Sequence, residues 1–172
     1  NLMTKVIEDC RIGGSPIEES TRYVLYDAKK NGRWRYVCPD DIKESGLGNA
    51  FVANMDFIFA TYAEMVEPMQ ALFRKRLTQD AFEIEVERDG KIQKAGLKSL
   101  QGENEIKAHR IAYNFTIRSA ACDVIRCILP ACTQANVGLV GNGRYYSGLI
   151  TKLLSHDFTE AHGLAEAIRK AL

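Results

Sequence analysis

Apolar residues recur at helical spacing along most of this chain. Five segments share this period: 2–11, 50–77, 104–129, 143–155 and 157–171. Pro68 lies inside the second segment and predicts a kink or a break there, whereas Pro130 predicts the end of the third. Asp157 is suited to cap the first turn of the fifth. The pattern therefore predicts a mostly helical protein.

Two other segments have the pattern of β-hairpins. In 21–38, stretches rich in β-branched and aromatic residues flank Asn31-Gly32, which favours a tight turn because both residues tolerate positive φ. In 82–103, alternating apolar positions and an Asp-Gly turn predict a short surface hairpin that continues into a loop. We interpret this second segment as an insertion. The expected fold is α+β, mostly helical with a β-hairpin at about 21–38.

Length and composition indicate one domain spanning 1–172, because 46 % of the residues are hydrophobic and can form a core. The 23 Lys and Arg residues nearly balance the 22 Asp and Glu residues. This balance argues against a long nucleic acid as the main partner, since such binding needs many basic phosphate contacts. No apolar run approaches the roughly 20 residues that cross a bilayer, so no membrane partner is expected. A small anionic ligand needs only a few arginines and stays open.

The cysteines and histidines suggest neither a disulfide framework nor a metal site. The cysteine count is five, an odd number, and no pair has Cys-x-x-Cys spacing. The three histidines lie far apart in the sequence. Reduced thiols and a cytoplasmic location are expected. The chain starts at Asn1 without a signal-peptide pattern and with a helix-like pattern already under way, so we expect the protein to begin upstream.

Two segments concentrate residue types that bind small anions. Residues 11–23 carry two arginines, two serines and two glutamates between a predicted helix and a predicted strand, where ligand-binding groups often collect. Residues 125–144 carry Arg126 at a helix end and Arg144 after a glycine-rich connection. Arginine donates paired hydrogen bonds to phosphate or to a nucleobase edge. The alternatives are solvated charges in the first segment and, for Arg126, a cation at the negative end of a helix.

Three motifs, in this order, resemble those of the flavin-dependent thymidylate synthases. Residues 18–23 (Glu-Glu-Ser-Thr-Arg-Tyr) are similar to that family's Glu-Gln-Ser-x-Arg-Tyr segment. Residues 126–130 (Arg-Cys-Ile-Leu-Pro) are similar to its Arg-x-x-Leu-Pro helix end. Asn142 and Arg144 follow at the spacing of its Asn-x-Arg motif. The likeness spans nearly the whole chain apart from 82–103.

The resemblance implies reductive methylation of dUMP to dTMP, with FAD as cofactor and with NADPH and methylenetetrahydrofolate as co-substrates. The family uses no covalent enzyme nucleophile, so the protein supplies positioning and electrostatics. Carried over by position, the catalytic residues are Arg126 and Ser20. The dUMP-binding residues are Ser20, Arg22, Arg126, Glu18 and Ser15. The FAD-binding residues are Arg11, Asn142 and Arg144. The resemblance also implies a homotetramer whose active sites are each assembled from several subunits.

The sequence departs from the family at several of its ligand-binding positions. The family's Arg-His-Arg triplet is replaced at residues 9–11 by Asp-Cys-Arg, which turns one positive charge into a negative one. Other family positions also carry different residues: a glutamine falls at Val6, an asparagine at Gly148 and an arginine at Leu153. Lys152 can replace that arginine as a point charge but not as a bidentate donor.

Two other functions stay open. A non-catalytic nucleotide-binding or assembly domain that kept the fold but lost flavin would account for the altered triplet. An RNA- or DNA-binding domain would depend on residues 33–36 (Arg-Trp-Arg-Tyr), because aromatic and basic side chains together are typical of surfaces that stack bases. An ordinary hairpin explains residues 33–36 equally well.

Overall fold

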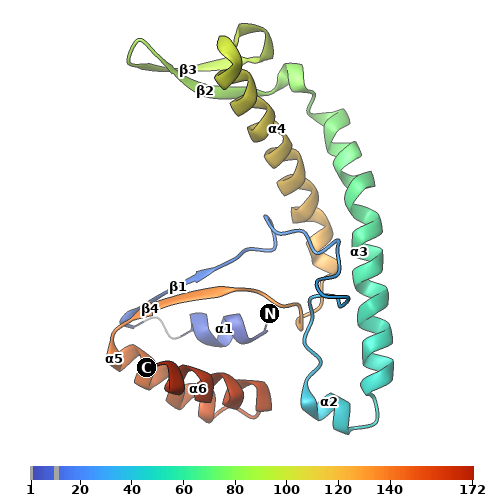
Figure 1. The fold of residues 1–172 in the computed structure, drawn as a ribbon, viewed down its shortest axis with the longest axis vertical. Coiled ribbons are helices and arrows are strands. Elements are labelled where there is room, and N and C mark those ends of the chain that lie inside the picture. Colours follow the sequence, from blue (N-terminus) through green and yellow to red (C-terminus); the bar gives the residue numbers. More distant parts are fainter. Residues whose placement is uncertain (1, 10–11) are drawn as a thin grey trace.

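Two long helices run side by side and give the molecule its elongated shape (Figure 1). The computed structural model describes residues 2–9 and 12–172. Helix α3 spans Gly48–Arg76 and helix α4 spans Gly102–Ile125. Both bury side chains at the spacing that the sequence predicts: Phe59, Tyr62 and Val66 on α3, and Tyr113, Ile117 and Ala121 on α4. These helices and the antiparallel strand pairs described below confirm the expected α+β class.

A β-hairpin joins the two helices at one end of the molecule (Figure 1). Strand β2 (Glu83–Arg88) pairs antiparallel with β3 (Lys91–Gly96), which confirms the hairpin predicted in 82–103. Asp89 and Gly90 form the turn with φ angles of 52° and 71°, a conformation that glycine and short polar residues adopt most readily. Short 3-10 turns flank the hairpin: η1 at Gln79–Ala81 and η2 at Leu97–Ser99.

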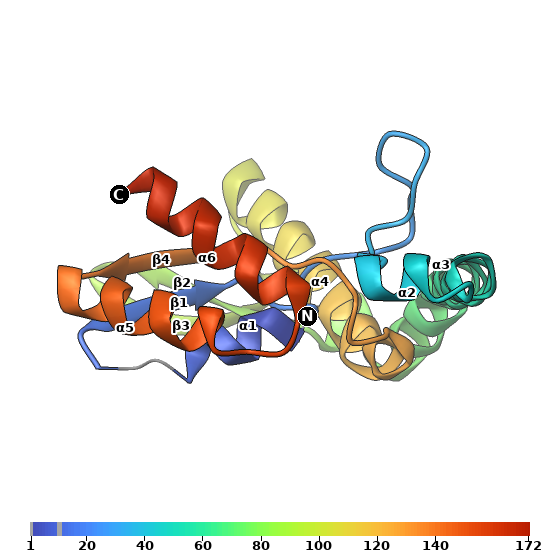
Figure 2. The same ribbon diagram turned by 90° about the horizontal axis from the view of Figure 1, so that it is seen from below.

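A second packed region lies beside the other end of α4 (Figures 1 and 2). It consists of α1 (Leu2–Glu8), β1 (Gly14–Glu18), β4 (Val137–Gly141), α5 (Gly143–Leu154) and α6 (Thr159–Ala171). Its core contains side chains from the three helices: Met3, Val6, Ile7, Tyr145, Leu149, Leu153, Ala161 and Ala165. Strands β1 and β4 form a two-stranded antiparallel ribbon. The expected helices near both ends of the chain therefore pack together into one core.

The hairpin predicted at about 21–38 is wrong as a strand pair, although its turn is present. Asn31 and Gly32 have φ angles of 54° and 77°, but the turn closes only one isolated bridge, and no strand occurs within 21–38. Tyr36 instead bridges to Thr133. The aromatic side chains of this segment pack on α3 rather than on one another across a ladder. Tertiary packing has therefore replaced the local pairing that residue preferences favour. The short helix α2 (Asp40–Glu44) follows.

Three smaller expectations also need correction. Residues 14–18 form β1 rather than a loop, because their partner strand lies far away in the sequence. Asp157 does not cap α6, because the N-cap position of that helix is occupied by Phe158. The Phe158 ring stacks on His156, with ring centroids 4.7 Å apart. Pro68 does not break α3, which continues to Arg76. Pro68 is exposed and removes only one backbone donor, while α4 packs along the buried face of the same helix.

Within residues 2–9 and 12–172, every helix is too short or too polar to cross a membrane. The same residues contain no group of three or more His, Cys, Asp or Glu side chains placed to hold a metal ion. Whether 1–172 forms one domain with an insertion at 82–103 stays a prediction.

Candidate functional site

The ribbon of β1 and β4 joins the segments that carry the first and third sequence motifs, with the first motif at its Glu18 end and Asn142 at its Gly14 end. Ser15 lies opposite Val140 in the ladder, and Glu18 lies opposite Val137. The pairing extends beyond the strands, because the backbone N–H of Asn142 donates to the carbonyl of Gly13 at 3.1 Å. Residues distant in the sequence therefore share one ribbon that leads directly into α5.

Two glycines make room for an aromatic ring at the end of this ribbon. Gly14 and Gly141 lie opposite each other, and a Cβ atom on either would come within 2.3 Å of the ring of Tyr145. The Tyr145 ring is 3 % exposed. Asn142 caps α5, because its Oδ1 accepts from the Tyr145 backbone N–H at 2.9 Å. The start of α5 is therefore held in a fixed position against the ribbon.

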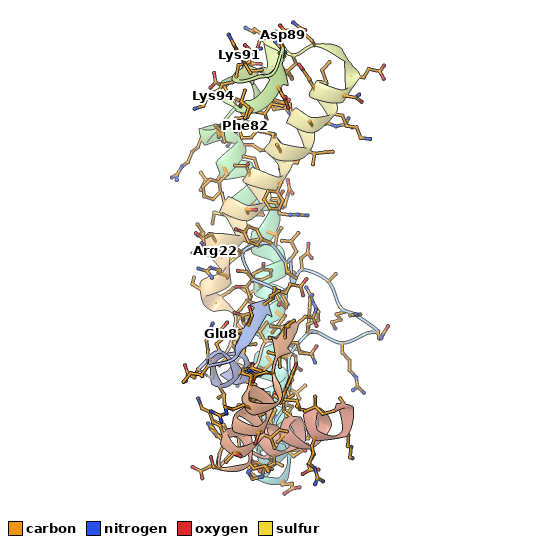
Figure 3. The ribbon with its side chains drawn as sticks, turned by 90° about the vertical axis from the view of Figure 1, so that its left-hand side faces the viewer. Glu8, Arg22, Phe82, Asp89, Lys91 and Lys94 are labelled. Carbon is orange, nitrogen blue, oxygen red and sulfur yellow. The ribbon has the colours of Figure 1, made fainter. Side chains whose placement is uncertain are left out.

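Two arginines predicted to bind the nucleotide meet at one carboxylate. The Nε atoms of Arg22 and Arg126 both lie 3.0 Å from Oδ1 of Asp123. Arg22 reaches α4 from the segment after β1, as Figure 3 shows, and Arg126 follows the last residue of α4 in the 3-10 turn η3 (Arg126–Ile128). The three side chains are between 34 % and 52 % exposed, so both guanidinium groups stay accessible to a ligand. The arrangement forms a cationic pair held by one anion.

Arg126 also lines an open hollow of about 290 Å³. Thr21 and Lys5 contribute to the same hollow, together with the chain that follows η3. Thr21 neighbours Ser20, so the hollow joins the first motif to the second. A small anionic ligand placed here would contact groups from α1, from the turn after β1 and from the end of α4.

Ser20 shapes the turn that carries Arg22. The Ser20 hydroxyl accepts a hydrogen bond of 3.3 Å from the Arg22 backbone N–H. The Ser20 carbonyl accepts one of 3.0 Å from the Tyr23 backbone N–H. The Tyr23 ring then stacks on Phe115 of α4, with centroids 5.6 Å apart. Serine favours such turns because its hydroxyl can bond to nearby backbone groups. Ser20 therefore holds a position from which Arg22 reaches Asp123.

Glu18 is tied to α1. Lys5 lies 3.3 Å from its carboxylate and 2.8 Å from that of Glu8. Partial burial alone would raise the pKa of Glu18, but hydrogen bonds with Thr4, Glu8 and Lys5 outweigh burial and hold that pKa below its usual value. Glu18 therefore remains a carboxylate that fixes β1 to α1.

The other predicted site residues are dispersed. Ser15 lies on the exposed face of β1, whereas Glu18 lies on the face that packs against the helices, because successive strand residues alternate. Arg144 is exposed in the first turn of α5, and none of the ion pairs among residues 2–9 and 12–172 includes it. Arg11 lies outside the described residues. Within this chain, the structure brings together Ser20, Arg22 and Arg126.

Two of the positions at which the sequence departs from the family are part of the core. Val6 is 9 % exposed and Leu153 is fully buried, and both belong to the cluster between α1, α5 and α6. Lys152, next to Leu153, lies 3.6 Å from the carboxylate of Asp9. The negative charge at Asp9 is therefore balanced from within the chain.

Sequence reasoning missed Asp123 and Tyr145. Asp123 stands three positions before Arg126 on a predicted helix, a spacing that places two side chains side by side, so a search for charged pairs would have found it. The Tyr145 ring packs against Gly14 and Gly141, and no local sequence pattern reveals that these two glycines pair.

Comparisons with known proteins agree with the motifs. The family model described as "Thymidylate synthase complementing protein" matches residues 2–172. The chain is 34 % identical over 165 residues to a UPF0159 protein of Chlamydia pneumoniae, covering 96 % of this chain and 26 % of that protein. It is 32 % identical over 173 residues to a UPF0159 protein of Thermoplasma acidophilum, covering 100 % of this chain and 34 % of that protein. The chain thus spans about a quarter to a third of the length of these curated relatives.

Proposed function

Because this chain belongs to the thymidylate synthase complementing protein family, the flavin-dependent one, we propose that it takes part in the reductive methylation of dUMP to dTMP. In this proposal FAD is the cofactor, NADPH and methylenetetrahydrofolate are co-substrates, and a homotetramer is the working assembly. The chain matches only part of its relatives, so the reaction is proposed for the whole protein to which it belongs. The observation that supports the proposal best is the convergence of Arg22 and Arg126 on Asp123.

The arginine pair suits a nucleotide monophosphate. A guanidinium group can bind a phosphate or a pyrimidine edge through two parallel hydrogen bonds. In our proposal Arg126 contacts the pyrimidine and stabilises negative charge that develops on the ring, and Arg22 binds the nucleotide from the opposite side of Asp123. Ser20 holds the turn and contacts the nucleotide, while Glu18 and Ser15 lie on the ribbon that leads to it. Asp123 holds the two guanidinium groups close together before the ligand binds.

The start of α5 suits the anionic part of FAD. A substituent at Gly143 would meet open space, Arg144 projects from the first turn, and backbone N–H groups at a helix start favour a phosphate. Asn142 and Arg144 would hold the cofactor there, and Arg11 is the third residue that we assign to it. When bound, the flavin supplies the hydride chemistry. The residues of this chain contribute binding and orientation.

The first experiment measures dUMP binding to purified protein by calorimetric titration. Replacing Arg126 with Ala should weaken binding beyond detection, because a site built on charge-assisted hydrogen bonds loses its main donor. Arg74→Ala is a matched control, since Arg74 is an exposed arginine that pairs with Glu67 on α3, away from the site. If Arg126→Ala left the affinity for dUMP unchanged, this assignment would be wrong.

A non-catalytic nucleotide-binding or assembly domain is the alternative, and the core placement of Val6 and Leu153 favours it. The two functions differ in their cofactor. A visible absorption band of flavin that NADPH bleaches would support the enzyme. A protein that remains colourless after incubation with FAD, yet binds dUMP, would support the alternative.

A further inference from the structure

A second hollow lies away from the site described above. It has a volume of about 480 Å³ and shares no lining residue with the hollow beside Arg126. Its walls come from the loop between β1 and α2, which projects from the body of the molecule, and from the beginning of α3 (Figure 2). Its main chemical groups are those of Lys29, Arg33, Trp34, Tyr36, Lys43 and Asp56. The volume falls in the range of small-molecule sites.

The tight turn at Asn31-Gly32 builds the cationic rim of this hollow. The backbone of Lys30 and Arg33 pairs through two hydrogen bonds of 2.8 and 3.1 Å, and Lys29 and Arg33, on either side of the turn, both line the hollow. In the part of the chain that the structure describes, no carboxylate pairs with Lys29 or Arg33. The rim therefore carries two positive charges that are available to a ligand.

The other charged groups of the hollow are already engaged. Lys43 binds Asp40 at 2.6 Å. Asp56 accepts a hydrogen bond of 2.8 Å from the Tyr36 hydroxyl. Burial, together with this bond to Asp56, raises the pKa of Tyr36 to about 12, so the hydroxyl stays a donor at neutral pH. A ligand would thus meet the cations of the rim and the rings of Trp34 and Tyr36.

Trp34 provides a flat aromatic wall that Lys29 partly covers. One side of the indole packs against Phe59 at a centroid distance of 5.9 Å, and the Nζ atom of Lys29 lies over the ring at 5.5 Å. Arg35, the remaining member of the basic and aromatic segment 33–36, turns inward. Its guanidinium lies over the Tyr26 ring at 4.0 Å and donates to the Leu25 carbonyl. Three of these four residues face the hollow, and the fourth supports the loop.

We propose that this hollow binds a mononucleotide or a similar planar heteroaromatic ring that bears a phosphate. The ring stacks on the outer face of Trp34, and the phosphate binds Arg33 and Lys29. Lys29 then moves from its place over the indole to the phosphate, exchanging a cation–π contact for an ion pair. A single nucleotide fits this volume, and the net charge of +1 does not favour a long strand.

The fluorescence of Trp34 tests this proposal directly, because the chain contains one tryptophan. Purified protein is titrated with AMP, UMP, adenosine and inorganic phosphate. We expect saturable quenching by a mononucleotide, with an affinity at least about tenfold higher than that for adenosine or phosphate alone. The Arg126→Ala variant should retain this signal, which separates it from binding at the first site.

Variants on the same turn locate the binding. Arg33→Gln and Lys29→Gln should each raise the Kd at least about fivefold. Lys30→Gln is the matched control, since Lys30 is exposed on the same turn but does not line the hollow, and its Kd should not change. Far-ultraviolet circular dichroism verifies that each variant is folded.

Four outcomes would overturn the proposal. They are the absence of quenching by both mononucleotides, loss of the signal in Arg126→Ala, an equal effect of Lys30→Gln, and much tighter binding of an oligonucleotide than of a mononucleotide.

Discussion

At the scale of single residues, one carboxylate organises two cations. Asp123 is half exposed and accepts ion pairs from Arg22 and Arg126, which come from segments about 100 positions apart. Exposed ion pairs of this kind add little to folding, because water screens them and long side chains lose freedom when they are held. The cluster therefore contributes little to stability, which is consistent with the ligand-binding role proposed for its arginines.

We expect the Arg126→Ala variant to be nearly as stable as the original protein. Its free energy of unfolding should fall by less than about 1 kcal/mol, because the lost partner is an exposed ion pair. Urea unfolding followed by circular dichroism measures the change. A much larger loss would mean that Arg126 supports the fold, and a binding defect in this variant would then not identify a ligand contact.

The raised pKa of Tyr36 leads us to expect a loss of stability in alkaline solution. Its pKa is raised from 10.0 to about 12, mainly by burial and also by its bond to Asp56. The folded state therefore holds this proton more tightly than the unfolded state, so the contribution is complete below pH 10 and is lost as the pH rises to about 12. Unfolding free energies measured across this window should decline less steeply for Tyr36→Phe. Equal slopes for both proteins would contradict this assignment.

At the scale of elements, the ribbon of β1 and β4 depends on its glycines. Gly14→Ala places a Cβ atom within 2.3 Å of the Tyr145 ring, so the ring or the strand must move. We expect a loss of about 1–3 kcal/mol in the free energy of unfolding, as for other overpacked sites. Gly138→Ala is the matched control, because its Cβ would meet only the Ile17 carbonyl, at 3.9 Å, in the same ribbon. Similar losses in both variants would show that strand preference, rather than the ring, is responsible.

The helices and the hairpin at 82–103 could be predicted from the sequence, because their signals are local. Periodicity located α3 and α4, and an Asp-Gly turn located the hairpin. The strands β1 and β4 escaped prediction, since each is short, contains glycine and pairs with a partner far along the chain. Contacts with a distant part of the chain also explain why the hairpin predicted at 21–38 does not form. Its aromatic residues suit a strand, but α3 offers them a larger apolar surface.

The candidate site could be predicted only in part. The resemblance placed Arg22 and Arg126 at one ligand, and the structure brings them to one carboxylate. Composition and spacing alone did not select them over other arginines. The apolar pattern of 2–11 predicts a buried helix, and Val6 is buried, but which elements surround Val6 and Leu153 depends on packing between the two ends of the chain.

At the scale of the whole molecule, the hairpin of β2 and β3 is joined to the beginning of α4 by the contacts of Arg88. Arg88 donates to the Glu105 carboxylate at 2.6 and 3.2 Å and to the Ser99 carbonyl at 2.9 Å, joining β2 to the first turn of α4. Figure 3 shows the hairpin, with Asp89, Lys91 and Lys94, at the opposite end of the long helices from Glu8 on α1. Loss of the Arg88 contacts should therefore act locally.

We predict that Arg88→Ala accelerates amide hydrogen exchange in β2 and β3 and leaves β1 and β4 unchanged, because local openings need not involve the rest of a fold. Hydrogen exchange measured by mass spectrometry on peptides from the β2–β3 hairpin and from the β1–β4 ribbon tests this. Lys91→Ala, an exposed change on the same hairpin, should alter exchange neither in the hairpin nor in the β1–β4 ribbon. Faster exchange throughout the molecule after Arg88→Ala would indicate one fully cooperative unit.

The pairing of β1 with β4 also sets an order of events during folding. Glu18 meets Val137 about 120 positions later, whereas α3 and α4 are joined by a short hairpin. Contacts between distant residues form more slowly than local ones, because a long loop must first close. The pair of helices α3 and α4 can therefore form while strands β1 and β4 are still apart. Such an intermediate has much of the final helix content but no ribbon, so protection of the β1 and β4 amides from hydrogen exchange, rather than helicity, reports that this protein has finished folding.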